Sequence, residues 1–144
     1  MIYIAADHNG YKLKEQLKQF LGLKKIRYLD LGPQRFVKRY DYPDFAVAVA
    51  RRVKGQDQGL LICGSGHGMA IAANKIRGIR AALCTTPFSA KMARHDDHAN
   101  VLVLASWETS PAKAKKIISV WLKTKASTVA RHVRRVKKIN RIDT

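Results

Sequence analysis

The sequence predicts an α/β protein: a doubly wound, five-stranded parallel sheet flanked by helices, with a C-terminal helical tail. Short apolar runs alternate along the chain with amphipathic stretches long enough to be helices, which is the pattern of βαβ units. The chain has 144 residues, of which 47% are hydrophobic, and this is enough for one domain with a substantial core. Residues 1–144 are therefore predicted to form a single domain.

The N-terminal part is predicted to hold two strands and two helices. Ile2–Ala6 is an apolar run, and Tyr11–Leu21 follows as a helix because its large apolar residues fall on one side. Arg27–Leu31 is the second predicted strand, since it stops at a Gly-Pro pair. A polar, basic loop then leads to a helix at about Pro43–Val53, whose proline suits the first helical turn.

The central part continues the alternation. Gly59–Cys63 is the third predicted strand, and Met69–Ile76 is predicted to be the start of a helix. Arg80–Cys84 is the fourth strand, Pro87–Arg94 a helix and Val101–Ala105 the fifth strand. Ligands of such sheets bind beyond the carboxyl ends of the strands, near the switch in strand order.

Two helices are predicted to close the chain. Pro111–Lys123 places its apolar residues on one side. Within Ser127–Ile142 the apolar residues recur at spacings of four, three and three, which fit a helix: Val129, Val133, Val136 and Ile139. Because few of them are large, this helix is expected to lie across the surface or against a second subunit.

Charge is the unusual feature of the composition. The formal net charge is +18 and the isoelectric point is near 10.4. Residues 113–144 form a basic tail with eleven Lys or Arg against one acid, Asp143. Such a balance indicates nucleic acid, an acidic partner, an anionic substrate or simply a solvated basic face. No apolar run has the length of a membrane span, so no membrane partner is expected.

The two cysteines, Cys63 and Cys84, form no CxxC pair and no metal-like spacing. Free thiols and the lack of a visible signal peptide favour a cytoplasmic location. Cys63 precedes a turn with little side chain, made of Gly64, Ser65, Gly66, His67 and Gly68. Such a turn lets a ligand approach backbone N–H groups and a helix N-terminus. The alternative is a tight strand-to-helix turn beside a buried, inert cysteine.

Polar residues follow the other predicted strands as well. Asp7-His8 ends the first strand, Cys84-Thr85-Thr86 ends the fourth, and residues 94–98 lead into the fifth. An Asp-His pair alone is commonly a helix cap. On the same edge as a glycine-rich turn and a thiol, the pair favours a functional site.

The chain resembles the ribose-5-phosphate isomerase B family, which includes the galactose-6-phosphate isomerase subunits. The matching stretches cover nearly the whole chain in order: "DHNGYKLKEQL", "YDYPDFA", "CGSGHGMAIAANKIRGIRAAL", "SAKMAR", "ANVLVLAS" and "ARHVRRV". This resemblance implies a Rossmann-like sheet, a homodimer with sites at the subunit interface, and no metal or organic cofactor. The implied reaction is aldose–ketose isomerisation of a phosphorylated sugar, in the type case ribose 5-phosphate to ribulose 5-phosphate.

The resemblance also implies the roles of the glycine-turn residues. Cys63 matches the family's base, and the position where some members carry a Glu base is Met69 here. The nearby helix N-terminus is expected to favour the thiolate and bring the pKa of Cys63 closer to neutrality. The N–H groups of residues 64–68 would meet the enediolate oxygens, helped by the Ser65 hydroxyl, with His67 at the rim.

Phosphate and sugar contacts follow from matches elsewhere. Arg131 and Arg135 match the arginines of the tail motif, and their spacing of four places both on one helix face. His8 matches a phosphate contact, while Asp7 and Asp41 match positions that hold sugar hydroxyls. The tail cations between and beyond the arginines, Arg134, Lys137 and Lys138, are expected to be solvated surface.

Two segments depart from the family pattern. Asp96 takes the position of the ring-opening His, with His95 or His98 as possible substitutes, and Asp97 takes that of a substrate-binding Asn. The His-Asp-Asp-His run also suggests a metal, but no further ligand is evident from the sequence. Trp107 stands where an arginine commonly helps to hold phosphate.

Three functions are therefore compared. A pentose-phosphate isomerase is preferred because Cys63, the glycine turn and both tail arginines are present. An isomerase of a hexose 6-phosphate or another sugar phosphate is the alternative within the same chemistry. A basic nucleic-acid-binding module on the same scaffold is the alternative from another class, but the tail lacks interleaved stacking aromatics.

Overall fold

The computed structural model describes residues 1–142; the last two residues of the predicted domain and basic tail, including Asp143, lie outside the described part. The elements run β1 (Ile2–Ala6), α1 (Tyr11–Leu23), β2 (Tyr28–Asp30), α2 (Tyr42–Arg52), β3 (Gln58–Cys63), α3 (His67–Ala73), β4 (Ala81–Leu83), α4 (Pro87–Asp96), β5 (Val101–Ala105), α5 (Pro111–Lys123) and α6 (Ala130–Ile142). The five strands form one parallel sheet in the order β2-β1-β3-β5-β4, so the predicted fold class is confirmed.

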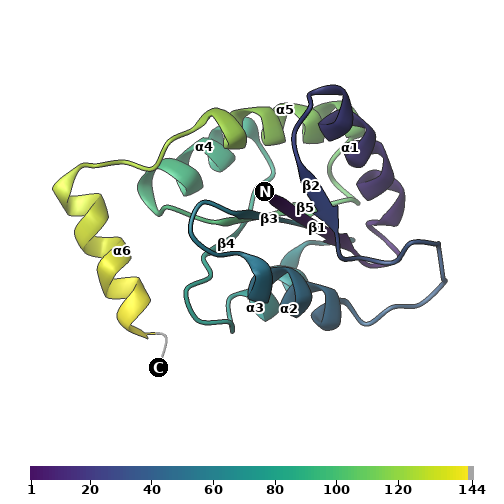
Figure 1. Cartoon of the computed structure of the whole chain (residues 1–144), viewed down its shortest axis with the longest axis horizontal. Helices are drawn as coiled ribbons and strands as arrows, with labels where there is room; N and C mark the ends of the chain where they lie inside the picture. The colour runs from purple at the N-terminus through teal and green to yellow at the C-terminus, as the bar shows by residue number, and fades with distance from the viewer. Residues whose placement is uncertain (143–144) are drawn as a thin grey trace.

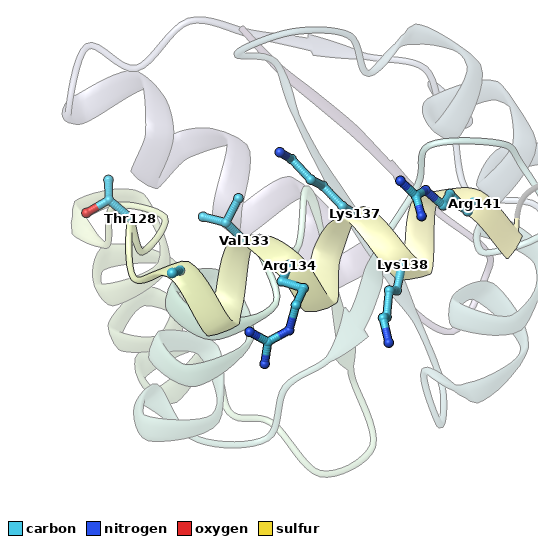
Figure 2. Close-up of a pocket in the computed structure, with 7 residues that line it drawn as sticks. Thr128, Val133, Arg134, Lys137, Lys138 and Arg141 are labelled. Atoms are coloured by element: carbon cyan, nitrogen blue, oxygen red, sulfur yellow. The ribbon is translucent and has the colours of Figure 1, made fainter.

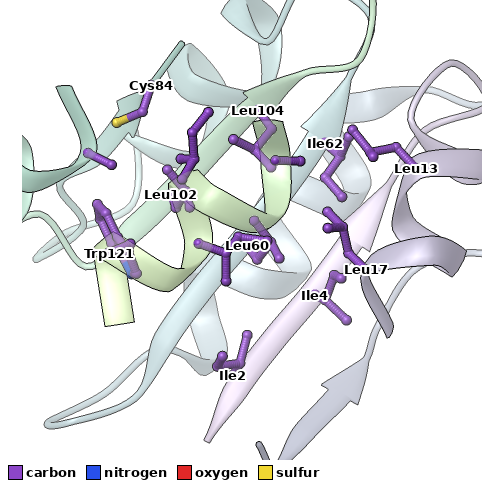
Figure 3. Packing of buried hydrophobic residues seen from close by; sticks show 14 of the residues in the cluster. Ile2, Ile4, Leu13, Leu17, Leu60, Ile62, Cys84, Leu102, Leu104 and Trp121 are labelled. Atoms are coloured by element: carbon purple, nitrogen blue, oxygen red, sulfur yellow. The ribbon is translucent and has the colours of Figure 1, made fainter. Parts of the chain in front are cut away.

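Helices cover both faces of the sheet (Figure 1). On one face α1, α4 and α5 pack on alternate strand residues, seen in Figure 3 with Ile4, Leu60 and Leu102 beneath them. On the other face α2 and α3 pack on the residues between, such as Leu61 and Cys63. Because side chains alternate along a strand, β3 supplies both cores, as expected for a strand buried on both sides.

The strand order reverses between β1 and β3, which are paired from Ile2 to Ala6. The chain moves from β1 outward to β2 through α1, and from β3 outward in the opposite direction through α3. With right-handed crossovers, opposite directions put the connecting helices on opposite faces. A crevice therefore opens between the ends of β1 and β3, where ligands of such sheets bind.

The edge strands are shorter than predicted. β2 covers Tyr28–Asp30 instead of Arg27–Leu31, and β4 covers Ala81–Leu83 instead of Arg80–Cys84. Each is an edge strand that pairs with a neighbour on one side only, so no hydrogen bonds from a second strand extend its ends. The tail helix likewise begins at Ala130 and not at Ser127.

α6 stands to one side of the layered body, at the end of an extended segment that follows α5 (Figure 1). The backbone N–H of Ser127 donates to the carbonyl of His95 at 2.9 Å and anchors this segment near the end of α4. Further along, an Arg80 nitrogen donates to Asn140 Oδ1 at 2.9 Å. In residues 1–142 no helix is long and apolar enough to cross a membrane.

A buried ion pair that the sequence did not indicate ties α1 to β2. The Lys14 ammonium is fully buried and pairs with the Asp30 carboxylate; it also donates to the carbonyl of Pro33 at 3.1 Å. Lys18 reaches the same carboxylate at 2.8 Å. Although burial acts to raise it, the hydrogen bonds from Lys14 and Lys18 hold the pKa of Asp30 below its ordinary value.

Asp30→Ala is expected to lower the free energy of unfolding by about 3–5 kcal/mol, because it removes the buried carboxylate partner of the Lys14 ammonium and leaves only the more exposed Glu15. Urea denaturation at neutral pH measures the loss. Since the folded-state pKa of Asp30 is lowered, its stabilisation is present at neutral pH and is lost as the pH falls through that lowered pKa. The difference between variant and wild type should therefore shrink in acid.

Glu15→Ala is the matched control, because Glu15 is a more exposed partner of the same two lysines. It should cost less than about 1 kcal/mol. Equal losses for Glu15→Ala and Asp30→Ala would contradict a special contribution of the buried pair.

Candidate active site

The turn after β3 follows Cys63 as predicted, but it is shorter than predicted because α3 begins at His67 and not at Met69. Gly66 adopts φ +81°, a left-handed conformation that favours glycine, and is the residue before the first turn of α3. This conformation aims the Gly66 N–H at Cys63 Sγ, 3.2 Å away. Ser65 Oγ accepts a hydrogen bond from the N–H of His67 at 3.4 Å, which leaves the hydroxyl proton free to be donated.

A cavity of about 240 Å³ opens beside this turn, at the crevice between β1 and β3. Five of the predicted site residues line it: Asp7, Cys63, Gly64, Ser65 and Gly68. Asn9, Tyr42 and Trp107 complete the lining. The structure thus joins residues from four separate segments of the chain, at positions 7–9, 42, 63–68 and 107, in one cavity.

Two aromatic rings lie against the glycines of this cavity. A Cβ on Gly64 would come within 2.5 Å of the Trp107 indole, and one on Gly68 within 2.5 Å of the Tyr42 ring. Because Gly64 and Gly68 carry no side chain, the Trp107 and Tyr42 rings can pack directly against the turn and form walls of the cavity. Sequence reasoning missed Tyr42, although it lies within the quoted "YDYPDFA" stretch.

The expected lowering of the Cys63 pKa is wrong for this chain as the structure describes it. Burial raises the pKa of the Cys63 thiol above its ordinary value. The N–H groups of Met69 and Gly66 act to lower the pKa, but they do not offset burial, and the Asp7 charge raises it further. The prediction counted the helix N-terminus and left out the low-dielectric core and the neighbouring carboxylate.

Asp7 combines the two alternatives considered from the sequence. Its Oδ1 accepts from the N–H groups of Asn9 and Gly10, both at 3.0 Å, so it closes the turn from β1 into α1. The same carboxylate lines the cavity beside Cys63. Asp7 therefore caps this turn and also lines the cavity, and its contact with substrate stays a prediction.

His8 and Asp41 lie near the cavity but do not line it. His8 Nδ1 accepts from the backbone N–H of Tyr40 at 3.2 Å and so holds the loop before α2 against the end of β1. Asp41 is the exposed residue before the first turn of α2, directly preceding Tyr42. Both predicted substrate contacts stay predictions.

The remaining predicted residues lie elsewhere in the subunit. Asp96 ends α4, Asp97 lines a separate cavity with Arg80 and Ile139, and both Arg131 and Arg135 are exposed on α6. Among residues 1–142, the cavity beside Cys63 is lined by no cationic side chain. One subunit therefore holds the predicted base and the predicted phosphate-binding arginines in different places.

The His-Asp-Asp-His run does not assemble as one cluster. His98 Nε2 contacts the carbonyl of Ser127 at 2.9 Å, in the segment that leads to α6. His95 Nδ1 lies 2.7 Å from Asp96 Oδ1, and the hydrogen bond from His95 holds the pKa of Asp96 below its ordinary value. The third group near Asp96 is His132 of α6, which the sequence did not single out.

Comparison with known proteins gives a consistent result. Residues 2–139 match the Ribose/Galactose Isomerase family. The chain is 43% identical to the probable ribose-5-phosphate isomerase B of Mycoplasma genitalium, covering 99% of this chain and 95% of that protein. It is 38% identical to ribose-5-phosphate isomerase B of Escherichia coli, with the same coverage of 99% and 95%.

The fold agrees with solved structures as well. A crystal structure of ribose-5-phosphate isomerase B from Mycoplasma genitalium with bound ribulose-5-phosphate superposes with a TM-score of 0.94 at 43% identity, covering 99% of this chain and 95% of that one. The isomerase B from Clostridium thermocellum gives 0.93 at 41% identity, with coverage of 99% and 96%.

Asp7→Asn is expected to lower the pKa of Cys63, because it removes a neighbouring negative charge while its side-chain oxygen can still accept from Asn9 and Gly10. The carbon-13 shift of labelled Cys63 Cβ, followed against pH in a Cys84→Ala background, measures this. In the unmodified site the midpoint should lie above that of an unfolded cysteine.

Asp44→Asn, at an exposed carboxylate in the first turn of α2, is the control and should leave the midpoint in place. An unchanged midpoint in Asp7→Asn, or a wild-type midpoint near neutrality, would refute the electrostatic account of this thiol.

Proposed function

Because this chain belongs to the Ribose/Galactose Isomerase family, we propose that it interconverts ribose 5-phosphate and ribulose 5-phosphate. The observation that carries the proposal is the position of Cys63, at the wall of the cavity and beneath a turn of backbone N–H groups. The names of the relatives, and the ribulose 5-phosphate held by the similar crystal structure, supply the substrate.

In the proposed reaction Cys63 moves one proton. The thiolate takes the proton from C2 of the open-chain aldose, and the electron pair of that bond forms the enediolate. The thiol then returns the proton to C1, while the hydroxyl proton moves from O2 to O1. No electron enters or leaves, so the cavity needs no redox group.

The raised pKa of Cys63 has two opposite consequences. At neutral pH only a small fraction of the thiol is ionised, but each thiolate is a stronger base for a weakly acidic C–H proton. The Gly66 N–H is committed to the sulfur, so the enediolate oxygens depend on the other groups of the turn, above all the Ser65 hydroxyl.

A second copy of the chain is proposed to complete the site. A sugar phosphate carries a dianion, yet the cavity lining holds one carboxylate and no cation among the described residues. Arg131 and Arg135 are exposed on the displaced helix α6, which also exposes apolar side chains such as Ile139. In a symmetric dimer this helix can reach the neighbouring subunit, placing its arginines over the other cavity.

Substrate range is the open part of the proposal. Asp96 replaces a histidine at the position linked to ring opening, and one relative is named D-erythrulose-4-phosphate isomerase. A panel of ribose 5-phosphate, galactose 6-phosphate and allose 6-phosphate, followed as ketose or aldose formation, distinguishes the pentose from the hexose alternative. Highest kcat/KM on a hexose 6-phosphate would replace the pentose assignment.

The nucleic-acid alternative rests on α6. Figure 2 shows Arg134, Lys137, Lys138 and Arg141 projecting from this helix, and all four are exposed, as expected for solvated cations. Salt-sensitive RNA or DNA binding together with no turnover of any sugar phosphate would favour the binding module.

The proposed setting is the cytoplasm and the pentose phosphate pathway. Cys63 and Cys84 are both free and buried, and a cysteine base needs a reducing environment to stay a thiol. Retention of activity only in the presence of a thiol reductant would agree with this setting.

Cys63→Ala is expected to lower kcat by about 10³-fold, because it removes the proton acceptor. Turnover of ribose 5-phosphate, followed as ketose formation, measures the loss, with circular dichroism to check the fold. Cys84→Ala is the matched control: Cys84 is equally buried but packs on the opposite face of the sheet. Retained turnover in folded Cys63→Ala would remove Cys63 as the base.

Mixing two inactive variants tests the shared site. Cys63→Ala and Arg135→Ala subunits, unfolded together and refolded at equal amounts, should recover about a quarter of wild-type activity, because half of the dimers carry one intact composite site. If Cys63 and Arg135 of the same subunit act together, the mixture stays inactive, and the shared-site proposal fails.

A further inference from the structure

The geometry points to a transition-metal site where the end of α4 meets the start of α6, formed by His95, Asp96 and His132. One ligand atom from each residue, two imidazole nitrogens and a carboxylate oxygen, lies within 4.8 Å of the other two. We infer that this cluster binds a divalent cation of the Zn²⁺ class. This departs from the absence of a metal that the family resemblance implied.

The spacing of the ligand atoms suits such an ion. Asp96 Oδ1 lies 2.7 Å from His95 Nδ1 and 3.6 Å from His132 Nδ1. Metal–ligand bonds of about 2.0–2.2 Å in a tetrahedral site place neighbouring ligand atoms roughly 3.3–3.5 Å apart. Small rotations of side chains therefore bring the three atoms into coordination distance.

An independent observation comes from His132. Its side chain is only 8% exposed, and its Nδ1 is buried without a hydrogen-bond partner. A buried polar nitrogen without a partner is unfavourable, and this one faces the Asp96 carboxylate. A bound cation would accept the lone pair of His132 Nδ1. The competing explanation is that the contact of His132 with Asp96 is a direct side-chain pair with no ion between them.

One backbone hydrogen bond and one side-chain contact hold the two halves of the cluster together. The Ser127 N–H donates to the carbonyl of His95, and His98 Nε2 contacts the carbonyl of Ser127, both at 2.9 Å. These bonds hold the segment before α6 against the end of α4. The position of His132 near Asp96 is therefore fixed by the backbone that precedes α6 as well as by its own side chain. His95 and Asp96 are about two-fifths exposed, which leaves solvent access to a fourth coordination position.

The ligand atoms restrict the kind of ion. Arg131 lies close enough to act on Asp96, and the chain carries a net charge of +18, so positive charge opposes any cation that is not held by strong ligand bonds. A hard cation such as Mg²⁺ or Ca²⁺ requires several oxygen ligands, and this cluster offers one carboxylate. Imidazole nitrogens suit Zn²⁺, Co²⁺, Ni²⁺ and Cu²⁺, so selectivity for these ions over Mg²⁺ and Ca²⁺ is expected.

Calorimetric titration of the chelator-treated full chain with Zn²⁺ tests the site. One ion per subunit is expected, with no saturable binding of Mg²⁺. Asp96→Asn and the partly exposed His95→Ala should each weaken Zn²⁺ binding by at least about tenfold, since they remove a ligand. Asp97→Asn and His67→Ala are matched controls at a neighbouring carboxylate and a separate exposed histidine, and they should retain the ion.

Co²⁺ supplies a second readout that does not depend on turnover. Its visible spectrum should show the bands of a low-symmetry, four- or five-coordinate site in wild type and lose them in Asp96→Asn. No saturable binding to wild type would leave the explanation of a direct side-chain pair and overturn the metal site. Equal binding by Asp96→Asn, His95→Ala and wild type would place the ion elsewhere and also overturn it. Both readouts are independent of whether the protein isomerises ribose 5-phosphate.

Discussion

The parallel pairing of β1 with β3 is the constraint on which the candidate site depends. It aligns Ala6 with Ile62, so the residues after each strand emerge side by side. The turn after β1 lies so close to β3 that a Cβ on Gly10 would come within 2.3 Å of the Ile62 carbonyl oxygen. Asp7 closes this turn with its own side chain, and the same carboxylate then lies at the cavity beside Cys63.

Asp7 has opposite effects on the stability of the turn and on the ionisation of Cys63. Asp7 stabilises the turn by accepting two backbone N–H groups, but its charge disfavours the Cys63 thiolate. Burial of the sulfur between the sheet and α3 acts in the same direction. The N–H groups of Gly66 and Met69 are the opposing influence within the subunit. The result is a Cys63 thiol whose pKa lies above its ordinary value.

The exposed cations of the tail helix and the Cys63 thiol lie in different parts of the molecule. α6 stands to one side of the layered body (Figure 1). It exposes arginines and lysines, while the buried His132 places its Nδ1 3.6 Å from Asp96 Oδ1 at the end of α4. One side of this helix therefore packs toward the end of α4, and the other exposes positive charge.

Much of this was determined by the sequence alone. The apolar runs determined five parallel strands, because a strand buried on both faces needs a continuous apolar stretch. The glycine turn and its position after Cys63 were also local properties, since the turn is left-handed at residue 66 and glycine adopts that conformation at little cost. Tertiary structure decided the rest. The pKa of Cys63 depends on burial and on Asp7, fifty-six residues away in the chain. Likewise, the Tyr42 wall, the Lys14–Asp30 pair and the approach of His132 to Asp96 join residues whose proximity arises only when the elements pack, and no local pattern encodes such distances.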